Sequence, residues 1–113
     1  MLISDNIIIE RYQGVLAQGH AMLAHAHNGD WGALVALQDQ YVCHVAQLAD
    51  FEKDMELDEA TRARKYELLV EICRAEDSVR DLLQARMRDI SEFMSQSRRR
   101  QRVSQAYETG VPG

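Results

Sequence analysis

The chain has 113 residues, of which 46% are hydrophobic and 27% charged, and its formal net charge is -5. This length fits one domain and is too short for a second independent one. The acidic excess argues against general nucleic-acid binding, because a phosphate backbone requires excess positive charge on at least one protein face. The abundance of Ala, Leu, Gln, Glu and Arg, with a single Pro at position 112, predicts an all-α protein without strands.

The first predicted helix spans about residues 6–27. Ser4 or Asp5 can cap its start, because either side chain can accept a hydrogen bond from a backbone N–H of the first turn. Apolar residues recur at helical spacing and make a face wide enough for two neighbouring helices. The face consists of Ile8, Tyr12, Val15, Met22 and Ala26, with Ile9, Leu16 and Leu23 beside them.

A three-residue connection, Asn28-Gly29-Asp30, follows this helix. Asn or Gly can take the left-handed conformation that ends a helix, and Asp30 can cap the next one. The connection is so short that the first helix and the second, at about 31–51, must be antiparallel neighbours. Trp31 is expected to anchor the packing of this hairpin. The apolar stripe of the second helix is Leu34, Tyr41, Val45 and Leu48, with Val35, Val42 and Ala49 alongside.

Residues 50–59 carry six acids and one Lys, which predicts a solvated loop and the negatively charged first turn of a third helix. That helix, at about 58–97, contains no Gly or Pro and would be about 60 Å long, against about 35 Å for each helix before it. Part of its stripe therefore has no partner within the chain, and we expect a homodimer. The stripe is Leu69, Ile72, Cys73, Val79, Leu83, Met87, Ile90 and Met94.

Two charged residues, Glu76 and Arg86, interrupt this stripe. Their stems can pack while their charges stay in water, or they can set register at a partner surface. After Gln96 the character changes, and a short, mobile, amphipathic C-terminal helix followed by a flexible tail is predicted for 98–113. Its arginines are typical of a solvated face or of partners for a helix C-terminus. The residues of this segment are Arg98, Arg99, Arg100, Arg102, Val103, Ala106 and Tyr107.

The sequence offers little for catalysis. None of the four histidines has a Glu three residues before it, which argues against a di-metal site in the bundle. Cys43 and Cys73 occupy apolar helical positions and are predicted to be buried and reduced. Glycine loops and phosphate cradles are absent from the sequence, so we expect neither an enzyme nor a cofactor, although a nucleophile made of Cys43 and a histidine stays open. We find neither a secretory signal nor a membrane-spanning run, and we expect a cytoplasmic protein.

A set of residues in the second half of the chain is similar to a known family. The set comprises Glu76, Leu82-Leu83-Gln84-Ala85-Arg86-Met87, Asp89-Ile90, Gln96-Ser97, Gln101 and Ala106-Tyr107, together with Gly29-Asp30-Trp31 and Tyr41. With these residues the chain resembles the FliT family of flagellar type III export chaperones over about residues 8–108.

The resemblance implies an antiparallel three-helix bundle followed by a short, mobile helix that controls access to partners. It implies binding of the C-terminal helical segment of the filament cap protein FliD, and of the master regulator FlhDC, the export ATPase complex and the export gate. Family positions for partner binding fall on Leu69, Cys73 and Arg80, and Cys73 is smaller than the aliphatic residue usual there. A groove between the second and third helices would then be lined by Tyr41, Val45, Leu48, Leu69, Ile72, Cys73, Glu76, Val79, Arg80 and Leu83.

Two other functions are compatible with the sequence. A coiled-coil adaptor would self-associate through the long stripe without any client. A DNA-associated regulator would use the arginines at 98–102 and would bind less tightly as salt is added. We expect no direct nucleic-acid binding and no membrane insertion.

Overall fold

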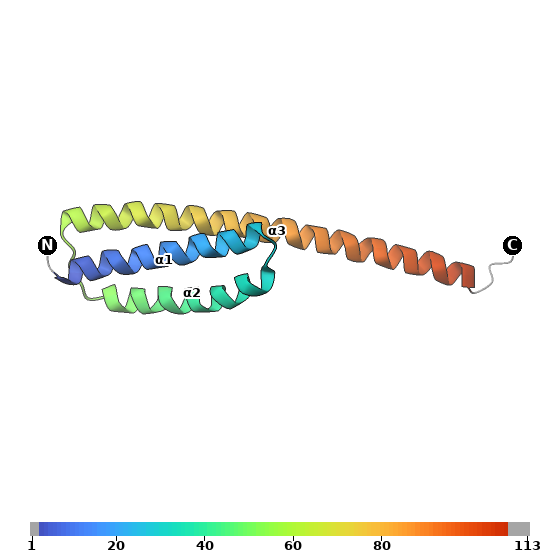
Figure 1. Ribbon diagram of the computed structural model, residues 1–113, viewed down its shortest axis with the longest axis horizontal. Helices are drawn as coiled ribbons and strands as arrows, with labels where there is room; N and C mark the ends of the chain where they lie inside the picture. Colours follow the sequence, from blue (N-terminus) through green and yellow to red (C-terminus); the bar gives the residue numbers. More distant parts are fainter. Residues whose placement is uncertain (1–2, 109–113) are drawn as a thin grey trace. The chain divides into compact units, whose positions relative to one another are not determined.

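The structure is a computed structural model that describes residues 3–108. Its helices are α1 (Ile3–His27), α2 (Trp31–Glu52) and α3 (Glu59–Glu108), and residues 3–108 contain no strand (Figure 1). The all-α prediction is confirmed. The chain divides after Leu82 into two compact units. The first unit contains α1, α2 and the beginning of α3, and the second contains the rest of α3.

The first unit is a three-helix bundle whose core lies between its helices (Figure 1). The predicted face of α1 is confirmed, since all five of its central residues are buried. Gly19 of α1 faces Ala75 of α3, and a Cβ at this position would lie 3.4 Å from the Cβ of Ala75, in ordinary van der Waals contact. The buried apolar residues are Ile8, Tyr12, Val15, Met22 and Ala26 of α1, Leu34, Tyr41 and Leu48 of α2, and Leu68, Ile72, Ala75 and Val79 of α3.

The turn between α1 and α2 has the predicted chemistry. Gly29 has φ of 71°, in the left-handed region that favours glycine. Its N–H donates to the Ala26 carbonyl at 3.2 Å, and the Asp30 N–H donates to the His25 carbonyl at 2.9 Å. These two bonds form a Schellman motif, which satisfies carbonyls at the end of α1. Asp30 then caps α2 by accepting a hydrogen bond from the Ala33 N–H at 3.3 Å.

The start of α1 differs from the prediction. The helix begins at Ile3, so Asp5 lies inside its first turn and does not cap it. The Asp5 side chain is 2% exposed, and its Oδ2 accepts a hydrogen bond from the Thr61 hydroxyl at 3.2 Å. The Asp58 carboxylate caps α3 by accepting from the Thr61 N–H at 2.7 Å, and hydrogen bonding with Thr61 lowers the pKa of Asp58. A tertiary contact with Thr61 has thus taken the place of a local cap.

The separate C-terminal helix predicted from residue 98 is wrong. Residues Arg98 to Glu108 continue α3, which is one helix of 50 residues. The change in composition at Arg98 is not a helix boundary, because the segment has no Gly or Pro and is rich in the good helix formers Arg, Gln and Ala. The flexible tail predicted after Gly110 lies outside the described residues.

The second unit exposes the apolar residues that the sequence predicted to lack an intramolecular partner. Met87, Ile90 and Met94 are exposed and Leu83 is half-buried, whereas Val79, the preceding stripe residue, belongs to the core of the first unit. The predicted homodimer, which would cover this stripe, stays a prediction.

The turn glycine provides a test of the fold. We expect Gly29→Ala to lower the free energy of unfolding by about 1 to 2 kcal/mol, because an L side chain is strained in the left-handed conformation. Gly32→Ala is the matched control: a Cβ there meets nothing within 4 Å, and Ala favours the helix. Urea unfolding followed by circular dichroism measures both variants. A Gly29→Ala protein as stable as the Gly32→Ala protein would contradict the turn assignment.

Candidate partner-binding surface

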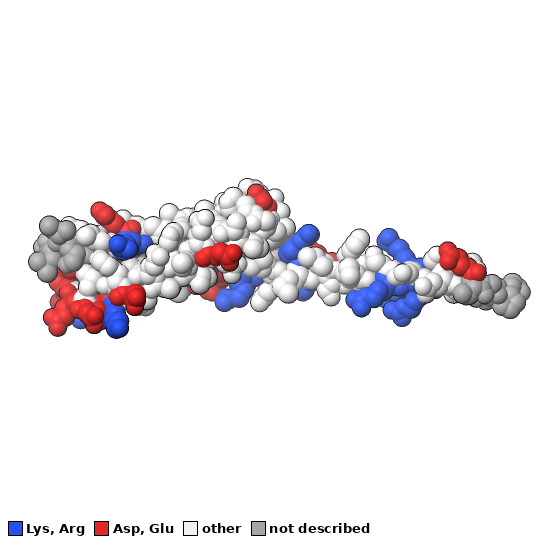
Figure 2. All heavy atoms as spheres, turned by 90° about the horizontal axis from the view of Figure 1, so that it is seen from below, with Lys and Arg blue, Asp and Glu red and all other residues white. Residues whose placement is uncertain are grey.

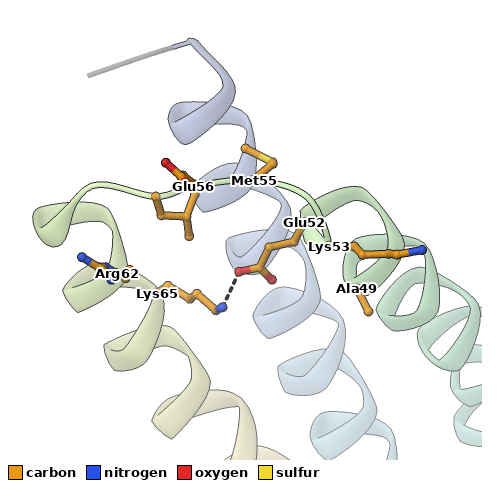
Figure 3. Close-up of a pocket in the computed structure, with 8 residues that line it drawn as sticks. Ala49, Glu52, Lys53, Met55, Glu56, Arg62 and Lys65 are labelled. Carbon is orange, nitrogen blue, oxygen red and sulfur yellow. Dashed lines mark hydrogen bonds and ion pairs between the residues drawn. The ribbon is translucent and has the colours of Figure 1, made fainter.

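One carboxylate joins the three helices of the first unit. Glu52, in the last turn of α2, accepts a hydrogen bond from the Tyr12 hydroxyl of α1 at 2.5 Å. It also forms an ion pair with Lys65 of α3 (Figure 3). Because its side chain is largely buried, this pairing is screened less than one at the surface. Farther along α2, the Tyr41 hydroxyl donates to the Glu76 carboxylate of α3.

The two tyrosines are held in their neutral form. Burial, then the hydrogen bond to Glu52, raises the pKa of Tyr12 above its ordinary value. Burial and the bond to Glu76 do the same for the pKa of Tyr41. Ionisation of either phenol would place a negative charge beside a carboxylate and remove the donor of the bond.

These contacts show which flank of α2 lies beside α3. Tyr41 and Glu52 bond to α3, whereas His44 bonds to Gln18 and Phe51 lies under Arg11 of α1. At about 100° per residue, Val35, Val42, Val45 and Ala49 fall on the side of Tyr41 away from α1. By the same reasoning Tyr66, Leu69 and Cys73 fall on the side of α3 nearest α2. We call this surface the α2–α3 strip: Val35, Val42, Val45, Ala49, Tyr66, Leu69 and Cys73.

The α2–α3 strip is apolar and open to solvent. Val42 is 60% exposed and Tyr66 is 69% exposed, and of the other members only Leu69 is half-buried. From Trp31 to Ala49 the one charged residue is Asp39, which lies one helical turn from Val35 and from Val42, at the outer edge of the strip. Figure 2, a view from the α2 side, shows mainly uncharged side chains over the middle of the first unit. An apolar surface of this kind on two adjacent helices is typical of a site for another helix.

A pocket of about 620 Å³ lies where α2 leads into α3 (Figure 3). Its lining mixes Glu52, Lys65 and Arg62 with the apolar side chains of Ala49 and Met55. Glu52 and Lys65 are paired with each other, and the lining also contains Lys53 and Glu56, so charges of both signs are mixed there. It marks one end of the strip.

Four of the residues predicted to line the groove are instead part of the core. Tyr41, Leu48, Ile72 and Val79 are at most 7% exposed, so they support the strip from below and cannot contact a partner. Periodicity identified them as apolar but did not separate the core from its rim.

The other predicted groove residues are accessible. Val45, Cys73, Glu76 and Arg80 are exposed and Leu69 is half-buried. Glu76 bonds to Tyr41, and Arg80 forms an ion pair with Asp77. Leu83 is half-buried and belongs to the second unit.

Four strip residues were not predicted as site residues: Val35, Val42, Ala49 and Tyr66. Val35 and Val42 are seven residues apart and lie beside the predicted stripe of α2, so the sequence could identify them as residues that flank that stripe. Which flank is uncovered depends on where α3 packs, and the sequence of α2 does not contain that information. Tyr66 had no signal, because it precedes the apolar repeat of α3.

The prediction that both cysteines are buried is wrong. Cys43 and Cys73 are free and exposed, because each lies outside the narrow sector of its helix that faces the core. His44, next to Cys43, shares a hydrogen bond with Gln18 across the helix pair. The described residues contain no cluster of three or more His, Cys, Asp or Glu that could hold a metal ion. A search of the same residues found no helix that is both long and apolar enough to cross a membrane.

The chain matches the family model described as "Flagellar protein FliT" over residues 9–109. It belongs to the FliT family. It is 31% identical over 104 residues to the flagellar protein FliT of Pectobacterium carotovorum, covering 92% of this chain and 82% of that protein. It is 29% identical over 106 residues to the FliT of Pectobacterium atrosepticum, covering 94% and 84%.

The fold agrees with this assignment. The crystal structure of flagellar protein FliT from Bordetella bronchiseptica superposes with a TM-score of 0.70 at 34% identity, covering 76% of this chain and 97% of that one. The resemblance to FliT inferred from the sequence is confirmed.

Because of the tyrosine–carboxylate hydrogen bonds, the stability of the folded protein should decrease at alkaline pH. A phenol whose pKa is raised by folding stabilises the native state below its ordinary pKa of about 10, and this contribution is lost as the pH rises above that value. We expect Tyr41→Phe to lower the free energy of unfolding by about 1 to 2 kcal/mol at neutral pH. Above about pH 10 the parent protein should lose stability more steeply than the variant, because the variant has one fewer shifted phenol.

Chemical unfolding at a series of pH values measures this difference, and Tyr66→Phe is the matched control because its ring is exposed. Parallel curves for the parent and the Tyr41→Phe protein above pH 10 would show that Tyr41 does not contribute.

Proposed function

We propose that this chain is a flagellar export chaperone that binds the C-terminal helical segment of the filament cap protein FliD along the α2–α3 strip. The observation that carries the proposal is the exposed apolar surface that Val35, Val42 and Val45 of α2 form with Tyr66, Leu69 and Cys73 of α3. Membership in the FliT family supplies the flagellar context.

The strip fits an amphipathic helix better than an extended peptide. Its members are apolar side chains on two helices, so they can bury the apolar face of a third helix, whose own backbone groups are already hydrogen-bonded. An extended peptide would instead need the exposed edge of a strand to pair with its backbone. Arg62 and Arg80 lie near its two ends by helical spacing and can face acidic residues of a client. A client helix held in this way has its own apolar face covered and is prevented from self-assembling.

The small Cys73 side chain limits how tightly the strip holds its client. A larger aliphatic residue at this position would bury more area and contribute about 25 cal/mol for each Å² of apolar surface removed from water. A chaperone must release its client at the export apparatus, and a shallow surface favours release. We include the export ATPase complex, the export gate and the master regulator FlhDC among the proposed partners, and we place the protein in the cytoplasm.

We also propose that residues 98–108 regulate access to the strip. The sequence assigned this role to a separate helix, but the segment continues α3. Returning to the strip of its own chain would require α3 to break, whereas reaching the strip of a second copy would not. The regulation proposed here therefore acts between copies, in keeping with the expected homodimer.

A coiled-coil adaptor is the second candidate. The observation that favours it is the spacing of Leu83, Met87, Ile90 and Met94 at steps of four, three and four, which is a heptad seam. An adaptor would bind its partner through this seam and would not require the α2–α3 strip.

Val42 offers the sharpest test of client binding. We expect Val42→Asp to weaken binding of a synthetic FliD C-terminal helix by at least about tenfold, because the carboxylate must be desolvated when the client docks. Because Val42 is 60% exposed, the fold should be unaffected. Isothermal titration measures the affinity, and circular dichroism measures the helix content of the same sample.

Ala36→Asp is the matched control. Ala36 lies on the same helix and is exposed, but it points away from the strip. Its substitution adds the same charge and should leave affinity unchanged. Unchanged binding by Val42→Asp would exclude the strip as the client site, and binding lost only on changing Ile90→Asp would favour the adaptor.

Truncation tests the regulatory proposal. A chain ending at Ser97 should bind the client helix about threefold to thirtyfold more tightly than the full chain, if the competing contact contributes about 1 to 2 kcal/mol. The gain should shrink on dilution, because the competitor is a second copy. A gain that does not depend on concentration would place the contact within one chain, and equal or weaker binding by the truncated chain would contradict the proposal.

A further inference from the structure

Positive charge is concentrated in the second unit. From residue 83 to residue 108 there are six arginines and three acids, whereas the first 82 residues carry seven basic residues against fifteen acids. Four arginines lie at Arg98, Arg99, Arg100 and Arg102, and no acid occurs between Glu92 and Glu108. All four are exposed. Figure 2 shows blue spheres gathered along this part of α3.

The same unit of α3 has an apolar face. At about 100° per residue, Leu83, Met87, Ile90 and Met94 fall within about 60° of one another, and Phe93 borders them. Met87 is 68% exposed and Phe93 is 63% exposed. The face continues through Ser97, Gln101 and Ser104, and Arg86, between Ile90 and Phe93 on the helical turn, is the one charged residue within it from Leu83 to Ser104.

Two of the arginines border this side of the helix, whereas Arg99 lies opposite it. Arg98 lies about 80° to one side of Ile90 and Arg100 about 80° to the other, by the turn of the helix. Their aliphatic stems can lie along the apolar face while the guanidinium groups reach outward. A guanidinium presents a planar set of donors that matches phosphate oxygens. Apolar side chains therefore point in one direction, and phosphate-binding groups flank the same side of the helix one to two turns after Met94.

We propose that residues 83–108 of α3 bind the surface of a bilayer that contains anionic lipids. The helix lies in the interfacial plane, with Met87, Ile90, Phe93 and Met94 among the upper acyl chains. Arg98 and Arg100 contact headgroup phosphates beside them. This is surface binding and not insertion across the membrane. It goes beyond the proposed chaperone function, because it would hold the client-binding unit at a membrane.

Other occupants match fewer of these features. Nucleic acid would pair with the arginines but leave the apolar face in water. A second copy in parallel register would cover the apolar face but place two clusters of four arginines side by side. A bilayer of anionic lipids matches the apolar face and the arginines at the same time.

Vesicle co-sedimentation of the full chain tests the proposal. The probe is phosphatidylethanolamine vesicles with phosphatidylglycerol, compared with vesicles in which phosphatidylcholine replaces the phosphatidylglycerol. Replacing Arg98, Arg99, Arg100 and Arg102 with Gln should weaken partitioning on the order of a hundredfold, since each basic residue near an anionic surface contributes about fivefold and Arg99, on the opposite side of the helix, contributes little. Phe93→Ser with Met94→Ser should weaken it by at least about tenfold, because less apolar surface is buried.

The matched control changes Arg11, Arg62, Arg64 and Arg74 to Gln. It removes the same four charges from the first unit, so it reproduces the change in net charge without touching the proposed site. Partitioning of this control should stay within about threefold of the parent, because charges beyond the Debye length of about 8 Å contribute little. Circular dichroism checks that every variant keeps its helix content.

Loss of partitioning in both sets of second-unit variants, with the control unaffected, supports the proposal. Loss with the arginine variants alone would overturn it, because binding would then be electrostatic adhesion without the apolar face. It would also be overturned if the parent bound a random DNA duplex and not the vesicles. Finally, absence of vesicle binding together with a dimer that Ile90→Asp dissociates in light scattering would make this face a dimer interface.

Discussion

Glu52 is the contact on which the packing of the first unit depends. It lies on α2, accepts a hydrogen bond from Tyr12 of α1, and pairs with Lys65 of α3. A largely buried carboxylate costs free energy unless it is both paired and hydrogen-bonded, and here both conditions are met by residues from different helices. An alternative packing that moved any one helix by a turn would leave this charge unsatisfied. Glu52 therefore selects one arrangement from the several that the apolar faces alone would allow.

The exposed α2–α3 strip is a consequence of that selection. Once Tyr41 and Glu52 are directed toward α3, the helical turn leaves Val35 and Val42 on the outer flank of α2. The bundle has no fourth helix among its described residues to cover them. Binding a helix at this place would complete a four-helix packing, so the surface is complementary to the kind of partner that the FliT family context suggests.

The sequence predicted the parts of the fold that depend on local chemistry. Gly29 and Asp30 identified the turn because few other residues fit a left-handed position followed by a cap. The buried face of α1 was predicted because that helix has neighbours on two sides, so that its apolar residues are nearly all core. For α2 and α3 the same periodicity gave the centre of the apolar face but not its covered width. For that reason Cys73 was predicted to be buried and Val45 was placed in the apolar stripe of the second helix, and both residues are exposed.

The end of α3 shows a different limit of sequence reasoning. A change from apolar to basic composition at Arg98 suggested a new element, yet backbone conformation responds to helix propensity and not to charge. Arg, Gln and Ala propagate a helix whatever surface they present, and no Gly or Pro interrupts them before Glu108. Composition therefore marks where the function of a helix changes, while its ends are marked by caps and breakers. In this chain one helix has a core-packing segment and a solvent-exposed basic segment, and the boundary between them is chemical and not conformational.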